Sequence, residues 1–137
     1  MEININGLQH IGIPVTNLVL SENFYQSLGF EKVMGATFEI NHEQGNVSMM
    51  QRGNITIEIY QMPPLELEAV KQRKDGHVDH IAFDVDDIDV VFQTLKSNGY
   101  EVLEPAPVFL NFWNKGCKYF NIKGPDGERL EFNQILK

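Results

Sequence analysis

Residues 80–85 alternate apolar with small or polar side chains, which is the period of a β-strand with one buried face. A helical spacing of apolar residues follows over 87–98. An earlier stretch, 8–18, shows the same pattern 70 residues upstream, so that His10 corresponds to His80. The sequence therefore predicts a duplicated unit, and each copy opens with a histidine on a strand.

In the first copy, alternating apolar residues predict four strands, over residues 8–14, 30–35, 47–52 and 55–61. A helix is predicted to begin at Ser21 and to end before Gly29. Gly53 and Asn54 favour a turn, which predicts a hairpin between the last two strands. Residues 36–46 are polar and poorly patterned, so we expect a loop there.

Two prolines at 63–64 end the first copy, and residues 65–76 form a charged connector with room for a helical turn or two. The second copy is predicted to contain strands over 78–85, 100–103, 118–123 and 129–134, with a turn at 124–127. Residues 104–116 combine prolines with aromatic side chains, which predicts either a flap or a loop that covers the core. We therefore expect one domain over 1–137, built of modules at about 7–62 and 78–135 and a connector at 63–77.

Strand phase separates two faces in each copy. The branched and aromatic residues mark the face expected to be buried against the helices, and Ile11, Ile57, Ile81 and Leu130 represent it. On the opposite face lie a histidine of the first strand and a glutamate of the last strand, which are His10, Glu58, His80 and Glu131.

Two imidazoles and two carboxylates on one side of the strands suit a divalent ion such as zinc, nickel, cobalt, manganese or iron. A lone strand histidine is more often structural, and exposed strands carry glutamates routinely. Four such residues that obey an internal repeat nevertheless favour a metal site. A glutamate is also the most suitable general base in phase with that site, and Glu58 and Glu131 are equivalent candidates.

Composition narrows the choice of partners and compartment. The chain has 137 residues, 42% hydrophobic and 22% charged, which is typical of a globular protein. Its net charge of −8 argues against nucleic acid or an anionic membrane as a partner. A single cysteine, Cys117, excludes an internal disulfide. Because no signal-peptide pattern and no membrane-spanning apolar run is visible, we expect a cytoplasmic protein.

The paired motifs QHIGI at 9–13 and DHIAF at 79–83, with GPDG at 124–127 and LEF at 130–132, resemble the vicinal oxygen chelate superfamily. This superfamily includes glyoxalases, bleomycin-resistance proteins and extradiol dioxygenases. The resemblance implies an α+β fold of two tandem βαβββ modules, which form a cup-shaped mixed sheet with helices on the outer face. It also implies one metal ion, with the family's ligand roles falling on His10, Glu58, His80 and Glu131. Relatives are commonly dimers, so a homodimer is expected.

The ligand set is closest to lactoylglutathione lyases of the glyoxalase I type, since methylmalonyl-CoA epimerases usually have glutamine where this chain has Glu58. The resemblance thus implies a metal-dependent lyase or isomerase that moves a proton beside a chelated carbonyl of a small oxygenated substrate. Glyoxalases usually carry an arginine near the first helix, which grips glutathione, whereas residues 16–29 contain no basic side chain. Other small oxygen-rich substrates therefore fit equally well.

Two alternatives stay open beside this activity. One is an epimerase acting on a thioester or a sugar derivative, and the other is a non-catalytic protein that binds a small ligand. Among the residues that could contact a substrate, Tyr60, Tyr119 and Asn121 share the metal-facing phase, as do Cys117 and Asn133. Further candidates outside this phase argument are Arg52, Trp113 and Lys115.

Overall fold

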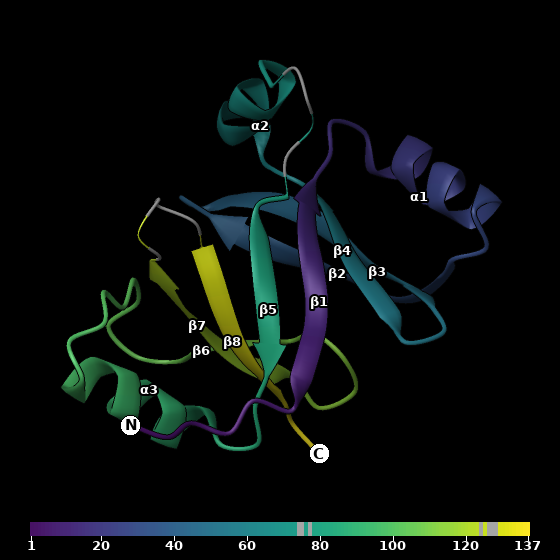
Figure 1. Cartoon of the computed structure of the whole chain (residues 1–137). Helices are drawn as coiled ribbons and strands as arrows, with labels where there is room; N and C mark the ends of the chain where they lie inside the picture. The colour runs from purple at the N-terminus through teal and green to yellow at the C-terminus, as the bar shows by residue number, and fades with distance from the viewer. Residues whose placement is uncertain (74–75, 77, 124, 126–128) are drawn as a thin grey trace. The chain divides into compact units, whose positions relative to one another are not determined.

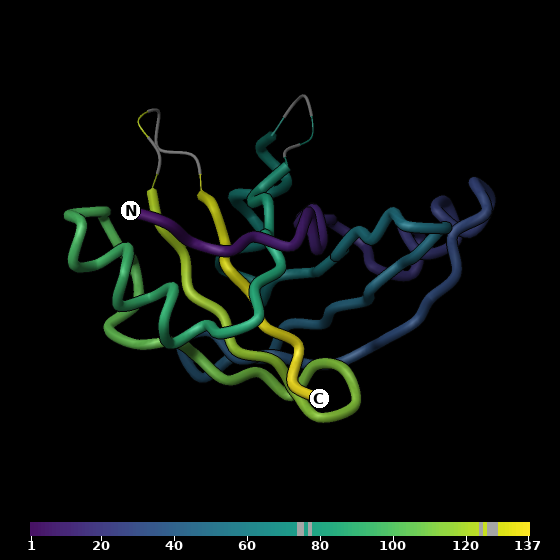
Figure 2. Tube along the Cα trace, turned by 60° about the horizontal axis from the view of Figure 1, so that its bottom comes forward, coloured from purple at the N-terminus to yellow at the C-terminus, as the bar shows by residue number. Residues whose placement is uncertain are grey.

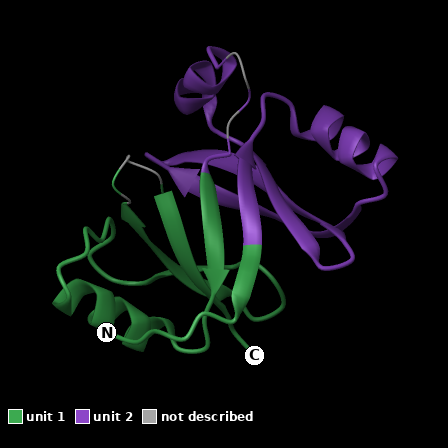
Figure 3. Cartoon of the chain, viewed as in Figure 1, with its two compact units in different colours: residues 1–9, 80–137 green, residues 10–79 purple. Residues whose placement is uncertain are grey.

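The structure is a computed structural model that describes all residues except 74–75, 77, 124 and 126–128. The chain divides into two compact units, shown in different colours in Figure 3. Unit 1 contains Met1–Gln9 and His80–Lys137, and unit 2 contains His10–Asp79. The turn expected at 124–127 lies outside the described residues, apart from Pro125. Among the described residues, no helix has the length and apolar character needed to cross a membrane.

Unit 2 is a four-stranded sheet with two helices (Figure 1). Its elements in chain order are β1 (Gly7–Pro14, of which unit 2 holds the part from His10 on), α1 (Leu18–Ser27), β2 (Glu31–Ile40), β3 (Glu43–Arg52), β4 (Ile55–Gln61) and α2 (Pro64–Lys71). The strands are ordered β2-β3-β4-β1. β1 runs parallel to β4, whereas the other two pairs are antiparallel.

Unit 1 repeats this arrangement with β5 (His80–Asp84), α3 (Ile88–Ser97), β6 (Val108–Leu110), β7 (Cys117–Lys123) and β8 (Arg129–Ile135). Its strands are ordered β5-β8-β7-β6, with β5 parallel to β8 and the others antiparallel. The end of the chain lies beside the start of β7, where the amide of Leu136 donates to the carbonyl of Gly116 at 3.0 Å (Figure 2). The predicted α+β fold with two βαβββ modules is confirmed.

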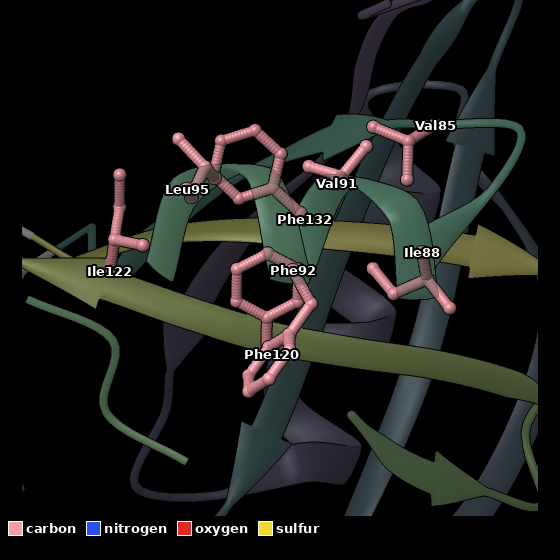
Figure 4. Close-up of a cluster of buried hydrophobic side chains, with 8 residues drawn as sticks. All are labelled: Val85, Ile88, Val91, Phe92, Leu95, Phe120, Ile122 and Phe132. Atoms are coloured by element: carbon pink, nitrogen blue, oxygen red, sulfur yellow. The ribbon is translucent and has the colours of Figure 1, made fainter. Parts of the chain in front are cut away.

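The core of unit 1 lies between α3 and its sheet (Figure 4). Asp87 caps the helix by accepting from the amide of Val90 at 3.1 Å, so the helix begins where the sequence predicts. The apolar positions of α3 then fall on one face and are buried: Ile88, Val91, Phe92 and Leu95. They pack on strand residues that include Phe120 and Phe132, whose rings stack at 5.3 Å. Each such side chain contributes about 1.5–3 kcal/mol through burial.

The core of unit 2 is built differently. None of the ten residues of α1, all of them described, is buried, and the fully buried cluster is formed by Met50, Ile57 and Ile59 of the sheet. Leu18 and Tyr25 of the helix pack partly buried against this cluster. A polar contact adds to this packing: the carboxylate of Glu22 accepts from the Ser48 hydroxyl at 2.5 Å and from the Lys32 ammonium at 2.9 Å. Burial raises the pKa of Glu22, but these hydrogen bonds and the Lys32 charge outweigh it, so the pKa lies below its usual value.

The predicted buried face holds at Ile57, which is 5% exposed, and Ile11 and Leu130 pack partly buried against their clusters. It is wrong for Ile81, which is 38% exposed. Phe83, two residues further along β5, packs against the cluster under α3, whereas Ile81 lies before the part of the strand that this cluster covers.

Two boundaries in unit 2 differ from the sequence prediction. Residues 36–46 are not a loop, because β2 continues to Ile40 and β3 begins at Glu43. The turn residues Asn41 and His42 adopt φ of 51° and 64°, and two successive positive φ values fit a two-residue hairpin turn. The helix α1 begins at Leu18 rather than Ser21, because the side chain of Asn17 accepts from the amide of Leu20 and caps it earlier.

The strand predicted at 100–103 is also wrong, since only Val102 forms an isolated bridge, to Ile122. The edge strand is β6, inside the segment 104–116 that was expected to be a flap or a covering loop. Pro105 and Pro107 lack the amide hydrogens that a continuous edge strand would use. Glu104 fills the interruption with its side chain, which accepts from the amide of Asn121 at 2.6 Å.

Candidate metal centre

His10 and Glu58 come together in unit 2 because β1 and β4 are parallel. Gly12 pairs with Glu58 in register, so His10, two residues earlier on β1, projects from the same face. The imidazole Nε2 of His10 lies 3.8 Å from Oε2 of Glu58, and the side chains are 1% and 12% exposed. Because Gly12 has no side chain, the space beside it on this face is left to the side chains of His10 and Glu58.

Unit 1 contains the equivalent pair. Ala82 of β5 pairs with Glu131 of β8, and His80 precedes Ala82 by two residues. The Nε2 atom of His80 lies 3.3 Å from Oε2 of Glu131, and these side chains are 7% and 10% exposed. As Gly12 does in unit 2, Ala82 places a small residue opposite the glutamate, and it is fully buried. Each unit therefore presents one imidazole and one carboxylate on equivalent parallel strands.

Both pairs have the chemistry and spacing of metal ligands. Divalent ions such as zinc take imidazole nitrogen and carboxylate oxygen at about 2.0–2.2 Å, so two adjacent ligands of one ion lie roughly 3 Å apart. The observed separations of 3.3 and 3.8 Å are close to this value. Near-complete burial also removes competing water from the two imidazoles. The residues of each unit thus fit half of a ligand set.

A chain of amide hydrogen bonds orients Glu131 within unit 1. The side-chain nitrogen of Asn133 donates to Oε1 of Glu131 at 2.8 Å, and the side-chain nitrogen of Gln9 donates to Oδ1 of Asn133 at 3.0 Å. Because Gln9 occupies the oxygen of Asn133, the nitrogen of that amide is turned toward the glutamate. This leaves Oε2 as the Glu131 oxygen on the side of His80.

The neighbours of Glu58 in unit 2 differ from those of Glu131. Its cross-strand partner is Met49, which is 1% exposed. Tyr60, at the position that corresponds to Asn133, packs its ring edge-on against Phe38 at 6.2 Å. The two copies of the fold thus keep the histidine and the glutamate but surround them with different side chains.

The substrate-binding candidates on the strands lie on two different faces. Tyr119 and Asn121 lie on β7 as cross-strand partners of Asn133 and Glu131, on the face that carries the glutamate. Arg52 has the opposite strand phase, and its guanidinium donates to the carbonyl of Leu28 at 2.6 Å, beyond the end of α1. That contact favours a structural role for Arg52.

The remaining candidates lie in the loop before β7. Lys115 is exposed, and Trp113 adopts a φ of 65°. The buried indole nitrogen of Trp113 has no hydrogen-bond partner among the described residues.

Sequence reasoning missed Gln9 and Glu104. Gln9 directly precedes His10, and a polar residue next to a proposed metal ligand on a strand could have been predicted to help position the site. Glu104 lies between a bridge residue and two prolines, where no strand phase applies, so no sequence pattern could have found it.

Comparison with known proteins agrees with this architecture. Residues 7–132 match the sequence profile of the Glyoxalase/Bleomycin resistance protein/Dioxygenase superfamily. The uncharacterized protein YwbC of Bacillus subtilis (strain 168) is 33% identical over 135 residues, which cover 93% of this chain and 96% of that protein.

Solved structures share the fold at lower identity. Methylmalonyl-CoA epimerase from Mycobacterium tuberculosis superposes with a TM-score of 0.81 at 16% identity, covering 100% of this chain and 93% of that chain. A variant of the Streptomyces coelicolor epimerase, in complex with 2-nitronate-propionyl-CoA, gives 0.79 at 20% identity, covering 98% and 100%. The resemblance predicted from the sequence is confirmed at the level of the superfamily: the chain belongs to the Glyoxalase/Bleomycin resistance protein/Dioxygenase superfamily.

Proposed function

We propose that this protein is a metal-dependent lyase or isomerase that moves a proton beside a carbonyl of a small oxygenated substrate. His10, Glu58, His80 and Glu131 are the proposed ligands of one divalent ion. The observation that carries the proposal is the repeated pair of a buried histidine and a glutamate, with separations of 3.8 and 3.3 Å on equivalent strands. Membership of a superfamily named for glyoxalases and dioxygenases supports it.

A bound divalent ion supplies Lewis acidity, which polarises a carbonyl oxygen and acidifies the neighbouring carbon. The two imidazoles serve as neutral nitrogen donors. A glutamate carboxylate accepts the proton and returns it to the same or a neighbouring carbon, which is general acid–base catalysis. Glu58 and Glu131 occupy equivalent positions, and both are candidates for this base.

Epimerisation of a thioester is the second candidate. Its support is the structural similarity to methylmalonyl-CoA epimerases, one of them holding a CoA ester analogue. The same proton transfer would serve both reactions. Glutathione is not part of the proposal, because residues 16–29 contain no basic side chain and Arg52 donates to the carbonyl of Leu28. A cytoplasmic homodimer stays a prediction, and light scattering of the purified chain would measure its mass.

Metal content tests the proposal directly. The chain is purified without chelator or histidine tag, and bound metal is measured by elemental analysis alongside thermal unfolding. We expect about one divalent ion per chain, and a loss of metal affinity in His10→Ala and His80→Ala because the remaining ligands no longer fill the shell. Stability should fall less, since both hydrophobic clusters are intact.

His42→Asn is the matched control, because His42 is an exposed turn residue with positive φ and asparagine tolerates that conformation. The control should keep its metal. Undiminished metal content in both alanine variants would contradict the ligand assignment. A wild-type chain that takes up no divalent ion would instead favour the non-catalytic ligand-binding protein.

A further inference from the structure

Asn121 occupies a distinctive place beside Glu131. It is the cross-strand partner of Glu131 on the neighbouring strand β7, so the two side chains project from the same face of the unit 1 sheet. Its side chain is buried, with 3% of the residue exposed. Asn121 therefore lies in the layer of side chains that contains one proposed metal ligand.

The orientation of the Asn121 amide is fixed by Glu104. One oxygen of this carboxylate accepts from the backbone amide of Asn121 at 2.6 Å, and the other accepts from its side-chain nitrogen Nδ2 at 2.7 Å. A carboxylate accepts hydrogen bonds and does not donate them when ionised, so it selects the nitrogen of the amide and turns the oxygen away. These two hydrogen bonds, which we call the Glu104 clamp, thus determine which atom of Asn121 is available to a ligand.

The available atom has no partner. Oδ1 of Asn121 is buried and makes no hydrogen bond to any described residue. An unpaired acceptor in a buried environment is unfavourable, and buried amide oxygens are nearly always bonded. The bond that Nδ2 of Asn121 donates to Glu104 holds the side chain in this orientation despite that cost, which is expected where a ligand supplies the missing donor.

We propose that Oδ1 of Asn121 accepts a hydrogen bond from the substrate, and that the substrate therefore carries a hydroxyl or N–H donor next to its chelating oxygens. This inference rests on the proposed function. It favours α-hydroxycarbonyl compounds over 2-carboxyacyl thioesters, which offer only acceptors around the reacting carbon at neutral pH. Asn121 is a specificity residue in this scheme, and Glu104 is the positioning residue that sets its amide.

A pair of small chelators tests this preference on the metal-loaded protein. Acetohydroxamate and N-methylacetohydroxamate both bind metals through two neighbouring oxygens, but only the first retains an N–H donor. Dissociation constants are measured by calorimetry after metal occupancy has been determined on the same samples. In the wild type, we expect acetohydroxamate to bind about tenfold more tightly than its N-methyl analogue, as a buried hydrogen bond allows.

Glu104→Gln changes the orientation of Asn121 without touching the ligand. The new amide nitrogen can no longer accept from Nδ2 of Asn121, so the asparagine amide is expected to flip and present its nitrogen instead of its oxygen. The preference for the N–H chelator should then disappear or reverse. Asn121→Leu should abolish it as well. Glu101→Gln, the same substitution at an exposed position three residues away, should leave it unchanged.

The outcomes separate the two proposals. If the metal-loaded wild type, Glu104→Gln and Asn121→Leu all show the same ratio of dissociation constants for the two hydroxamates, the proposed role of Asn121 is wrong. The proposed metal site is unaffected by that result. A wild-type chain that binds no divalent metal overturns the proposed function, and this inference with it. Because Glu104→Gln preserves size and one of the two hydrogen bonds, it keeps the inference testable even if Asn121→Leu fails to fold.

Discussion

Asn133 is not a proposed metal ligand, yet its side chain holds the carboxylate of Glu131 through a hydrogen bond. Its amide donates to Oε1 of Glu131 at 2.8 Å and is itself oriented by Gln9. Groups that orient metal ligands usually change metal affinity by 10–100-fold when they are removed. The amide pair Gln9–Asn133 therefore belongs with the candidate metal centre, although neither residue is a proposed ligand.

Asn133→Leu removes the donor and keeps a side chain of similar size. We expect the affinity for zinc or cobalt to fall about tenfold or more, because Glu131 loses the bond that fixes its carboxylate. Competition with a metal chelator of known affinity measures this change. Asn114→Leu, at an exposed loop position, is the control and should bind metal as the wild type does. Equal affinity of Asn133→Leu and the control would show that Asn133 does not support the metal centre.

The sequence predicted the paired histidine and glutamate residues well and the side chains around them poorly. His10 with Glu58, and His80 with Glu131, were matched by period-two phase and by the internal repeat, and the structure brings each pair within 4 Å. The clamp of Glu104 on Asn121 depends on an interrupted edge strand, which has no period. Side-chain bonds across an interruption cannot be inferred from the alternation of apolar residues.

The two helices that follow the first strand of each module differ in what they bury. α3 buries four side chains under a complete apolar stripe, whereas α1 leaves Val19, Leu20 and Phe24 more than half exposed. Unit 2 compensates with a sheet-centred cluster and with the contact of Glu22 to Ser48 and Lys32. We therefore expect the core of unit 1 to depend on its helix more strongly than that of unit 2.

Leu95→Ala tests the dependence of unit 1 on α3. Leu95 is 1% exposed within the cluster that Figure 4 shows, so its truncation leaves a cavity and should lower the free energy of unfolding by about 2–5 kcal/mol. Val90→Ala, on the outer face of the same helix at 59% exposure, should change it by no more than about 0.5 kcal/mol. Urea denaturation of both variants provides the comparison. Similar losses in the two would mean that α3 does not form this core.

Elements with a strong period were predicted, whereas the edge strand β2 was predicted too short and the edge strand β6 was missed. The stripe of α3 and the alternation of apolar residues in β1, β4, β7 and β8 mark the face that packs against the helices, and this alternation can be read directly from the sequence. β2 alternates half-buried and exposed residues over its second half, and it meets β3 through a turn without glycine, so its pattern is weak. β6 spans only Val108–Leu110 and owes its place to pairing with β7.

For the whole molecule, duplication explains why the chain carries two glutamates in equivalent positions. Each module contributes the same strand order and the same histidine and glutamate, but the neighbours have diverged. The cross-strand partner of Glu131 is Asn121, whereas that of Glu58 is Met49. A repeat of this kind would double the proposed ligand set and at the same time let one copy specialise. In the proposed function, the choice between Glu58 and Glu131 as the base would then depend on their neighbours rather than on the fold.

Glutamine substitution of Glu58 or Glu131 distinguishes a role as general base from a role as metal ligand. Glutamine retains an oxygen donor and nearly the same volume, but it cannot accept a proton in the reaction. We expect at least one of Glu58→Gln and Glu131→Gln to keep substantial metal while it loses about a hundredfold or more in proton transfer. Exchange of solvent deuterium into hydroxyacetone, followed by NMR, measures that transfer even though hydroxyacetone need not be the physiological substrate.

Metal occupancy must be determined on the same samples, because a ligand that binds metal less tightly would also slow the exchange. The exposed Glu101→Gln variant controls for the substitution itself and should exchange at the wild-type rate. If both glutamine variants exchange as fast as the wild type, neither glutamate is the base. If one loses exchange at full metal occupancy and the other does not, the duplicated carboxylates have divided their roles.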